Sequence, residues 1–174
     1  MTTRGIDYDR LTLKDAFDLA ILVEEEARDR YEELAAQLTL HHTPAAAGFF
    51  TKMTGIEEKH RQQLQVEREK KFGSEPRSIQ VELLYDIEAP GYDEVRAFMS
   101  LGDALRTALA SEVKAHAFFT EAVRNVKDPD AKALFSELCE EELEHQALVK
   151  AELAKLDPTP NGNPNDYSDD PVAL

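Results

Sequence analysis

Apolar residues recur every three or four positions in four separate stretches of the chain, which is the spacing of helices that bury one face. The first stretch follows a capping-box pattern at Thr12 and continues to Leu38. The second begins at Pro44, with Thr43 expected as its N-cap, and ends at Gly73. Both stretches are long enough to predict helices that cross a whole domain.

The second half of the chain repeats this arrangement. A third helix is predicted from the cap at Ser100 to Val126, and a fourth from Asp128 and Pro129 to Leu156. Four amphipathic helices of this length predict an all-α four-helix bundle. The bundle domain is expected to cover residues 1–156.

Two segments lack this periodicity. Residues 73–99 predict a long crossover between the second and third helices, with one short helix at Asp93 to Met99. Such a crossover lets the third helix run parallel to the second. Residues 157–174 are polar and rich in proline and glycine, and they predict a disordered C-terminal tail.

The motif Glu-x-x-His occurs twice on the apolar stripes, on the second and fourth helices. Positions i and i+3 project from one face of a helix, so each motif offers a carboxylate and an imidazole to the bundle interior. One further glutamate lies on the stripe of each preceding helix. The six candidate metal ligands are Glu24, Glu57, His60, Glu112, Glu142 and His145.

The two halves of the chain form an internal repeat. A shift of 88 residues places Glu24 on Glu112, and a shift of 85 residues places Glu57 on Glu142. The apolar positions around these glutamates coincide as well, which predicts two equivalent helical hairpins related by a pseudo-two-fold axis. A single Glu-x-x-His is common by chance in a glutamate-rich helix, but two copies in register favour a ligand role.

Carboxylates and imidazoles without thiolates suit iron or manganese. Six protein ligands for two metal ions leave coordination positions open for dioxygen or peroxide. The expected cofactor is therefore two iron ions, with manganese as the alternative. Without metal, some of the buried glutamates are expected to be protonated.

Two residues near these ligands are candidates for supporting roles. Tyr31 lies two turns after Glu24 and is expected to donate a hydrogen bond to a site carboxylate, with a redox role as the alternative. His116, one turn after Glu112, is expected either to support the ligands or to pack only. Six glutamates off the stripes are expected to form a solvated face: Glu25, Glu26, Glu58, Glu140, Glu141 and Glu144.

Composition narrows the classes of partner. The net charge of −15 disfavours nucleic acid and anionic membranes as partners. Cys139 is the single cysteine, which excludes a disulfide scaffold within these residues. No membrane-spanning run or signal peptide is recognisable, so a cytoplasmic protein is expected.

Over residues 12–156, the chain resembles the diiron domain of rubrerythrins in the ferritin-like superfamily. The segment from Glu24 to Tyr31 is similar to the first-helix motif Glu-x-x-Ala-Arg-x-x-Tyr of that family. The resemblance implies that the six candidate residues bind iron, with Glu57 and Glu142 bridging. It also implies a homodimer, and a diferrous site that reacts with hydrogen peroxide or dioxygen.

The sequence departs from the family at two points. Rubrerythrins usually carry a further glutamate where this chain has Ala115, and no rubredoxin domain is present in these residues. Electrons would then come from an external donor protein or from ferrous iron. The expected function is a diiron oxidoreductase in oxidative-stress protection or iron handling. A ferroxidase without peroxidase turnover and a non-enzymatic metal-binding bundle are the alternatives.

Overall fold

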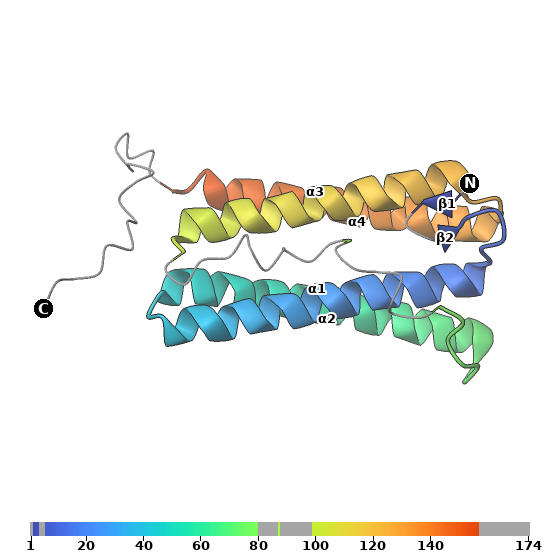
Figure 1. The fold of residues 1–174 in the computed structure, drawn as a ribbon, viewed down its shortest axis with the longest axis horizontal. Helices are drawn as coiled ribbons and strands as arrows, with labels where there is room; N and C mark the ends of the chain where they lie inside the picture. Colours follow the sequence, from blue (N-terminus) through green and yellow to red (C-terminus); the bar gives the residue numbers. More distant parts are fainter. Residues whose placement is uncertain (1, 4–5, 80–86, 88–98, 157–174) are drawn as a thin grey trace, which may run out of the picture.

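The computed structural model describes residues 2–3, 6–79, 87 and 99–156. Its helices are α1 (Leu13–Leu40), α2 (Pro44–Phe72), α3 (Leu101–Asn125) and α4 (Pro129–Leu153). Helix α1 pairs with α2 and α3 with α4, and the two hairpins pack together as a four-helix bundle (Figure 1). The predicted all-α bundle is confirmed, although α4 ends at Leu153 rather than Leu156.

A short antiparallel ribbon precedes the helices. Strand β1 (Thr2–Thr3) pairs with β2 (Ile6–Asp7). The ribbon was not predicted, because two-residue strands carry no detectable alternation of apolar and polar positions. Ile6 of β2 is buried with the residues of one end of the bundle.

Side chains at the helix starts satisfy free backbone N–H groups, as the sequence predicts. Thr12 forms a capping box with Asp15, and Ser100 forms one with Asp103. Asp128 accepts hydrogen bonds from two backbone N–H groups at the start of α4. It also accepts one from the backbone N–H of Leu13, which connects the start of α1 to the α3–α4 turn.

Thr43 is the N-cap residue of α2 and Pro44 its first residue, as predicted, but the Thr43 side chain makes no capping hydrogen bond. The Thr43 hydroxyl donates to the carbonyl oxygen of Leu38 at 2.9 Å and caps no N–H group of α2. His42 adopts a positive φ of 58° in the tight turn before it. This turn places Thr43 against the last turn of α1, whose free carbonyl groups need donors.

Two apolar clusters fill the bundle, one towards each end. The first contains Phe17, Phe119 and Phe135, and the second contains Leu38 and Phe50. Along each helix, the members of one cluster stop before the candidate ligands and the members of the other resume after them. The predicted metal ligands therefore occupy the polar layer between two apolar ends.

Helices α2 and α3 run in the same direction (Figure 1). The first half of α2 and the first half of α3 both pack in the cluster that contains Leu38. Most of the predicted crossover, residues 80–86 and 88–98, lies outside the described residues, as do most of the predicted short helix and the whole tail. None of the described helices is long and apolar enough to span a membrane.

Candidate metal centre

The six predicted ligands lie in the polar layer at the middle of the bundle. Glu57 and Glu112 have no exposed surface, and Glu24 and Glu142 are each 2% exposed. On the two Glu-x-x-His helices, His145 is buried and His60 is half-buried. Buried carboxylates are costly unless they are neutralised, paired or bound to a metal, so this layer needs a compensating charge.

Glu57, His60 and His145 form the first group of converging donor atoms. One ligand atom from each of the three lies within 4.8 Å of the others. The imidazole rings of His60 and His145 stack, with centroids 4.8 Å apart and planes 10° apart. The two Glu-x-x-His motifs therefore meet face to face, as the internal repeat predicts.

Glu112, Glu142 and His145 form the second group, under the same 4.8 Å limit. Nδ1 of His145 lies 3.1 Å from Oε2 of Glu112, at hydrogen-bonding distance, and 3.8 Å from Oε2 of Glu142. Two carboxylates and one imidazole nitrogen thus point at a common position. Such a convergence is the donor set of a divalent cation of the iron or manganese type.

Glu24 belongs to neither group by distance, but it borders the first. The carboxyl groups of Glu24 and Glu57 lie close enough to interact, and a hydrogen bond between them requires that they share one proton. Burial raises the pKa of Glu57 well above its usual range, and the negative charges of Glu24 and Glu112 raise it further. The structure therefore brings all six predicted ligands into one continuous cluster.

The chemistry of the first group fits a bound metal ion. Apart from the proton shared with Glu24, neither oxygen of Glu57 has a donor among the described residues, and Nδ1 of His60 has no partner there. Burial and the neighbouring His145 and Lys59 lower the pKa of His60 to about 4. Its imidazole is consequently neutral at pH 7, which is the form that binds metals.

Residues around Glu112 hold this ligand in place. The Tyr31 hydroxyl donates to Oε1 of Glu112 at 3.1 Å, which is the hydrogen bond that the sequence predicts. Gln146 donates from Nε2 to the backbone carbonyl oxygen of Glu112 at 3.3 Å, a contact that sequence reasoning missed. His116 is half-buried and belongs to neither donor group, so its supporting role stays a prediction.

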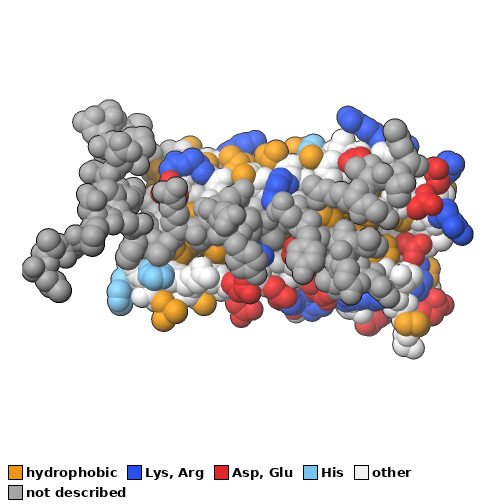
Figure 2. Space-filling model, viewed as in Figure 1, with side chains coloured by type: hydrophobic (Ala, Val, Ile, Leu, Met, Phe, Trp, Pro, Cys, Tyr) orange, Lys and Arg blue, Asp and Glu red, His pale blue; other side chains and the backbone are white. Residues whose placement is uncertain are grey.

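Glu25 and Glu58 lie off the apolar stripes and keep contact with solvent, as predicted, but both also form ion pairs that the sequence did not predict. Arg28 and Arg61 both bind Glu58, at 2.9 and 2.7 Å, and Arg77 binds Glu25 through both of its terminal nitrogens. Both glutamates are half-buried. Figure 2 shows acidic and basic side chains next to one another over the α1–α2 hairpin. Glu25 and Glu58 directly follow Glu24 and Glu57 in the sequence. Their ion-pair network therefore joins the two helices that carry these candidate ligands.

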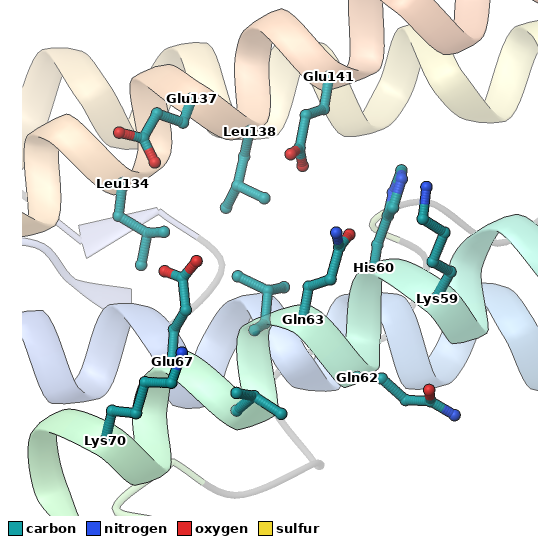
Figure 3. Close-up of a pocket in the computed structure, with 12 residues that line it drawn as sticks. Lys59, His60, Gln62, Gln63, Glu67, Lys70, Leu134, Glu137, Leu138 and Glu141 are labelled. Carbon is teal, nitrogen blue, oxygen red and sulfur yellow. The ribbon is translucent and has the colours of Figure 1, made fainter.

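A groove of about 560 Å³ lies between α2 and α4 and has His60 at one end (Figure 3). Buried leucines form part of its lining, namely Leu64, Leu134 and Leu138. Glu141, also predicted to be solvated, is half-buried in this groove, and burial raises its pKa. The i, i+3, i+4 spacing of Leu134, Glu137 and Leu138 indicates a common face of α4, but no local pattern predicts a groove between this face and α2.

The sequence profile of the Rubrerythrin family matches residues 15–153, with a second match at 103–170. A search of curated proteins gave no match. The fold is similar to the crystal structure of an uncharacterised conserved protein from Magnetospirillum magnetotacticum MS-1, with a TM-score of 0.64 and 25% identity. That similarity covers 82% of this chain and 93% of the other.

Proposed function

The chain belongs to the rubrerythrin family, and on that premise we propose that it is a diiron-carboxylate oxidoreductase that reacts with hydrogen peroxide or dioxygen. Its role would be protection from oxidative stress or the handling of iron. The observation that carries this proposal is Glu57, a fully buried carboxylate that faces two imidazoles and has only a shared proton for a partner. A cation at this position would satisfy both of its oxygens.

The six residues divide between two metal positions. Glu24, Glu57 and His60 would hold one ion, and Glu112, Glu142 and His145 the other, with Glu57 and Glu142 between them. Two ferrous ions would supply the two electrons that reduce hydrogen peroxide, together with two protons, to two molecules of water. An external donor protein or further ferrous iron would then restore the electrons.

The protein itself holds these ligands in place before metal arrives. Tyr31 fixes one oxygen of Glu112, and Gln146 fixes its backbone carbonyl group. The apolar clusters on both sides of the polar layer shield the carboxylates from bulk water along the bundle axis. Exclusion of water strengthens every electrostatic interaction within the layer.

The proposal can be tested by following the oxidation of anaerobically loaded ferrous protein after peroxide is added. We expect two ferrous ions per chain to be oxidised rapidly in the wild type and the reaction to fall to the background rate in Glu57→Ala. Glu58→Gln is the matched control, because Glu58 is the next residue but points into the ion-pair network. A wild-type rate no faster than that of Glu57→Ala would reject the proposal.

Ala115 favours a second candidate function, ferroxidase activity without peroxidase turnover. Ala115 is fully buried beside the site, where rubrerythrins usually carry a further glutamate. With an electron donor and excess peroxide present, a peroxidase completes many cycles for each pair of irons. A ferroxidase oxidises only the iron that is delivered to it. Counting the peroxide consumed per chain separates the two.

A non-enzymatic bundle remains the third candidate. A ligand that binds the folded state raises the apparent stability, so added iron should raise the melting temperature if the site is functional. Purified protein that contains no metal, and whose melting temperature does not change when iron is added, would favour the non-enzymatic bundle.

A further inference from the structure

His60 is the most accessible of the six candidate ligands. The other five are between 0% and 7% exposed, whereas His60 is half-buried and lines the groove between α2 and α4. Glu57, whose two oxygens have only the proton shared with Glu24, lies one turn earlier on the same helix. The groove therefore leads from solvent to the first donor group.

The groove has an apolar floor and polar walls. Its buried leucines form the floor, and side chains from both helices rise beside it. In Figure 3, Gln63 of α2 and Glu141 of α4 point towards one another next to His60, at the inner end of the groove. Glu67 and Glu137 line the more distant part.

The size and charge of the groove indicate which ions could pass through it. A volume of about 560 Å³ is many times the roughly 30 Å³ that one water molecule occupies in the liquid, so a hydrated ion fits. Three carboxylates (Glu67, Glu137 and Glu141) outnumber the two ammonium groups of Lys59 and Lys70 in the groove lining, and the chain as a whole carries a charge of −15. A cleft with an excess of negative charge raises the local concentration of cations.

Resting on the function proposed above, we propose that this groove is the route by which ferrous iron reaches the centre. Glu141 is the carboxylate that takes the hydrated ion from solvent and transfers it to Glu57 and His60. Glu141 is suited to this step because it is half-buried, faces the groove and adjoins Glu142 in sequence. It is a positioning residue for the metal rather than one of its final ligands.

Cobalt(II) can test the route without any redox reaction, because its visible absorption reports binding. The full-length, metal-free protein would be mixed rapidly with cobalt(II), and the rate of uptake and the equilibrium affinity measured separately. Glu141→Gln is compared with Glu140→Gln, which removes the same charge from an exposed position outside the groove lining. Gln63→Trp, which fills the groove, is compared with Gln37→Trp on the exposed face of α1.

We expect Glu141→Gln and Gln63→Trp to slow uptake about tenfold while the final affinity and stoichiometry stay at wild-type values. The two control variants should bind cobalt at the wild-type rate. Salt should slow uptake by the wild type more than uptake by Glu141→Gln, because screening removes the attraction that Glu141 supplies.

The failures of the two proposals are distinguishable. If the wild type binds neither cobalt nor iron, the proposed function itself is wrong. If the wild type binds two ions per chain and the groove variants bind them equally fast, only the route is wrong. A loss of affinity in Glu141→Gln at an unchanged rate would make Glu141 a ligand and would also overturn the route.

Discussion

The hydroxyl of Tyr31 donates a 3.1 Å hydrogen bond to Oε1 of Glu112 and so joins α1 of one hairpin to α3 of the other. Both side chains are fully buried. The internal repeat places Phe119 at the position equivalent to Tyr31, so the second hairpin has no hydroxyl there. The two halves of the site are therefore chemically unequal, and Glu112 is the ligand with the additional donor.

Tyr31→Phe should lower the free energy of unfolding of the metal-free protein by about 1–3 kcal/mol, because it leaves a buried carboxylate oxygen without its donor. The variant keeps the aromatic ring, which stacks on Phe50 at 5.6 Å, so the change isolates the hydroxyl group. Urea unfolding in a chelating buffer measures the effect. An unchanged unfolding midpoint would show that the hydroxyl contributes nothing to stability.

Glu57→Gln and Glu58→Gln should have opposite effects, although they alter adjacent residues. Gln at position 57 mimics the protonated form that the raised pKa of Glu57 favours, so the metal-free protein should be at least as stable at pH 7. It should also lose metal from the first donor group. Gln at position 58 should weaken the ion pairs with Arg28 and Arg61 and lower the melting temperature, with metal content unchanged.

Metal analysis and thermal unfolding of the two purified variants would show this contrast. Equal metal content in both variants would mean that Glu57 is not a ligand. A metal-free Glu57→Gln protein that melts far below the wild type would mean that the Glu57 carboxylate is ionised and stabilising in the apo state.

The metal-free protein should also show a distinct pH dependence. Because the pKa of Glu57 is raised in the folded state, its contribution to stability is complete below the unfolded value of 4.5 and is lost as pH rises through the folded value. The pKa of His60 is lowered to about 4, so its contribution is complete above 6.5 and is lost as pH falls towards 4. Glu57→Gln should remove only the first of these effects.

The free energy of unfolding of Glu57→Gln should therefore exceed that of the wild type by a gap that grows as pH rises from 4.5 towards 7. Urea titrations in chelating buffers at several pH values measure this gap. Metal binding must displace the Glu57 proton. Metal affinity should therefore fall by about tenfold for each unit by which pH is lowered, over the range in which one proton is displaced. A gap that does not change with pH would contradict the raised pKa.

The helices and the buried positions of the candidate ligands could be predicted because both depend on local periodicity. Glu24, Glu57 and Glu112 each occupy a position that the helical repeat assigns to the buried face, and each is buried. The repeat then distinguished these glutamates from neighbours of the same type. Capping residues such as Thr12 were predictable for the same reason, since the cap acts within one turn.

The contacts that the sequence did not predict depend on residues far apart in the chain. The ion pair of Glu25 was not predicted because its partner Arg77 lies 52 residues away, in the segment after α2. The groove beside Glu141 is lined by residues of α2 and α4, which lie far apart in the chain, and no pattern within either helix encodes it. Gln146 reaches a carbonyl group on another helix, and glutamine is equally common on exposed faces.

Asp18 and Arg68 form a second long-range interaction, at the opposite end of α2 from the α1–α2 turn. Nε of Arg68 donates to Asp18, and both side chains are buried, at 3% and 0% exposure. The backbone N–H and the hydroxyl of Ser78 also donate to Asp18, at 2.9 and 3.1 Å. Burial alone would raise the pKa of Asp18, but the hydrogen bonds from Arg68 and Ser78 outweigh it and lower the pKa.

Asp18→Asn should therefore lower the free energy of unfolding by about 3–5 kcal/mol at pH 7, because it leaves the Arg68 guanidinium buried without its counter-charge. The double variant Asp18→Asn/Arg68→Met should recover much of this loss, since no buried guanidinium without a counter-charge then remains, although Lys14 still loses its 3.3 Å ion pair with Asp18. Lys155→Met, which removes an exposed partner of Glu152, should leave the unfolding midpoint unchanged.

As the pKa of Asp18 is lowered, its contribution to stability is complete above the unfolded value of 3.8 and is lost as pH falls through the folded value. The difference in unfolding free energy between the wild type and Asp18→Asn should accordingly narrow only in strong acid. A double variant less stable than Asp18→Asn would show that Arg68 stabilises the fold through its packing and its bond to the Glu75 carbonyl oxygen rather than through the ion pair.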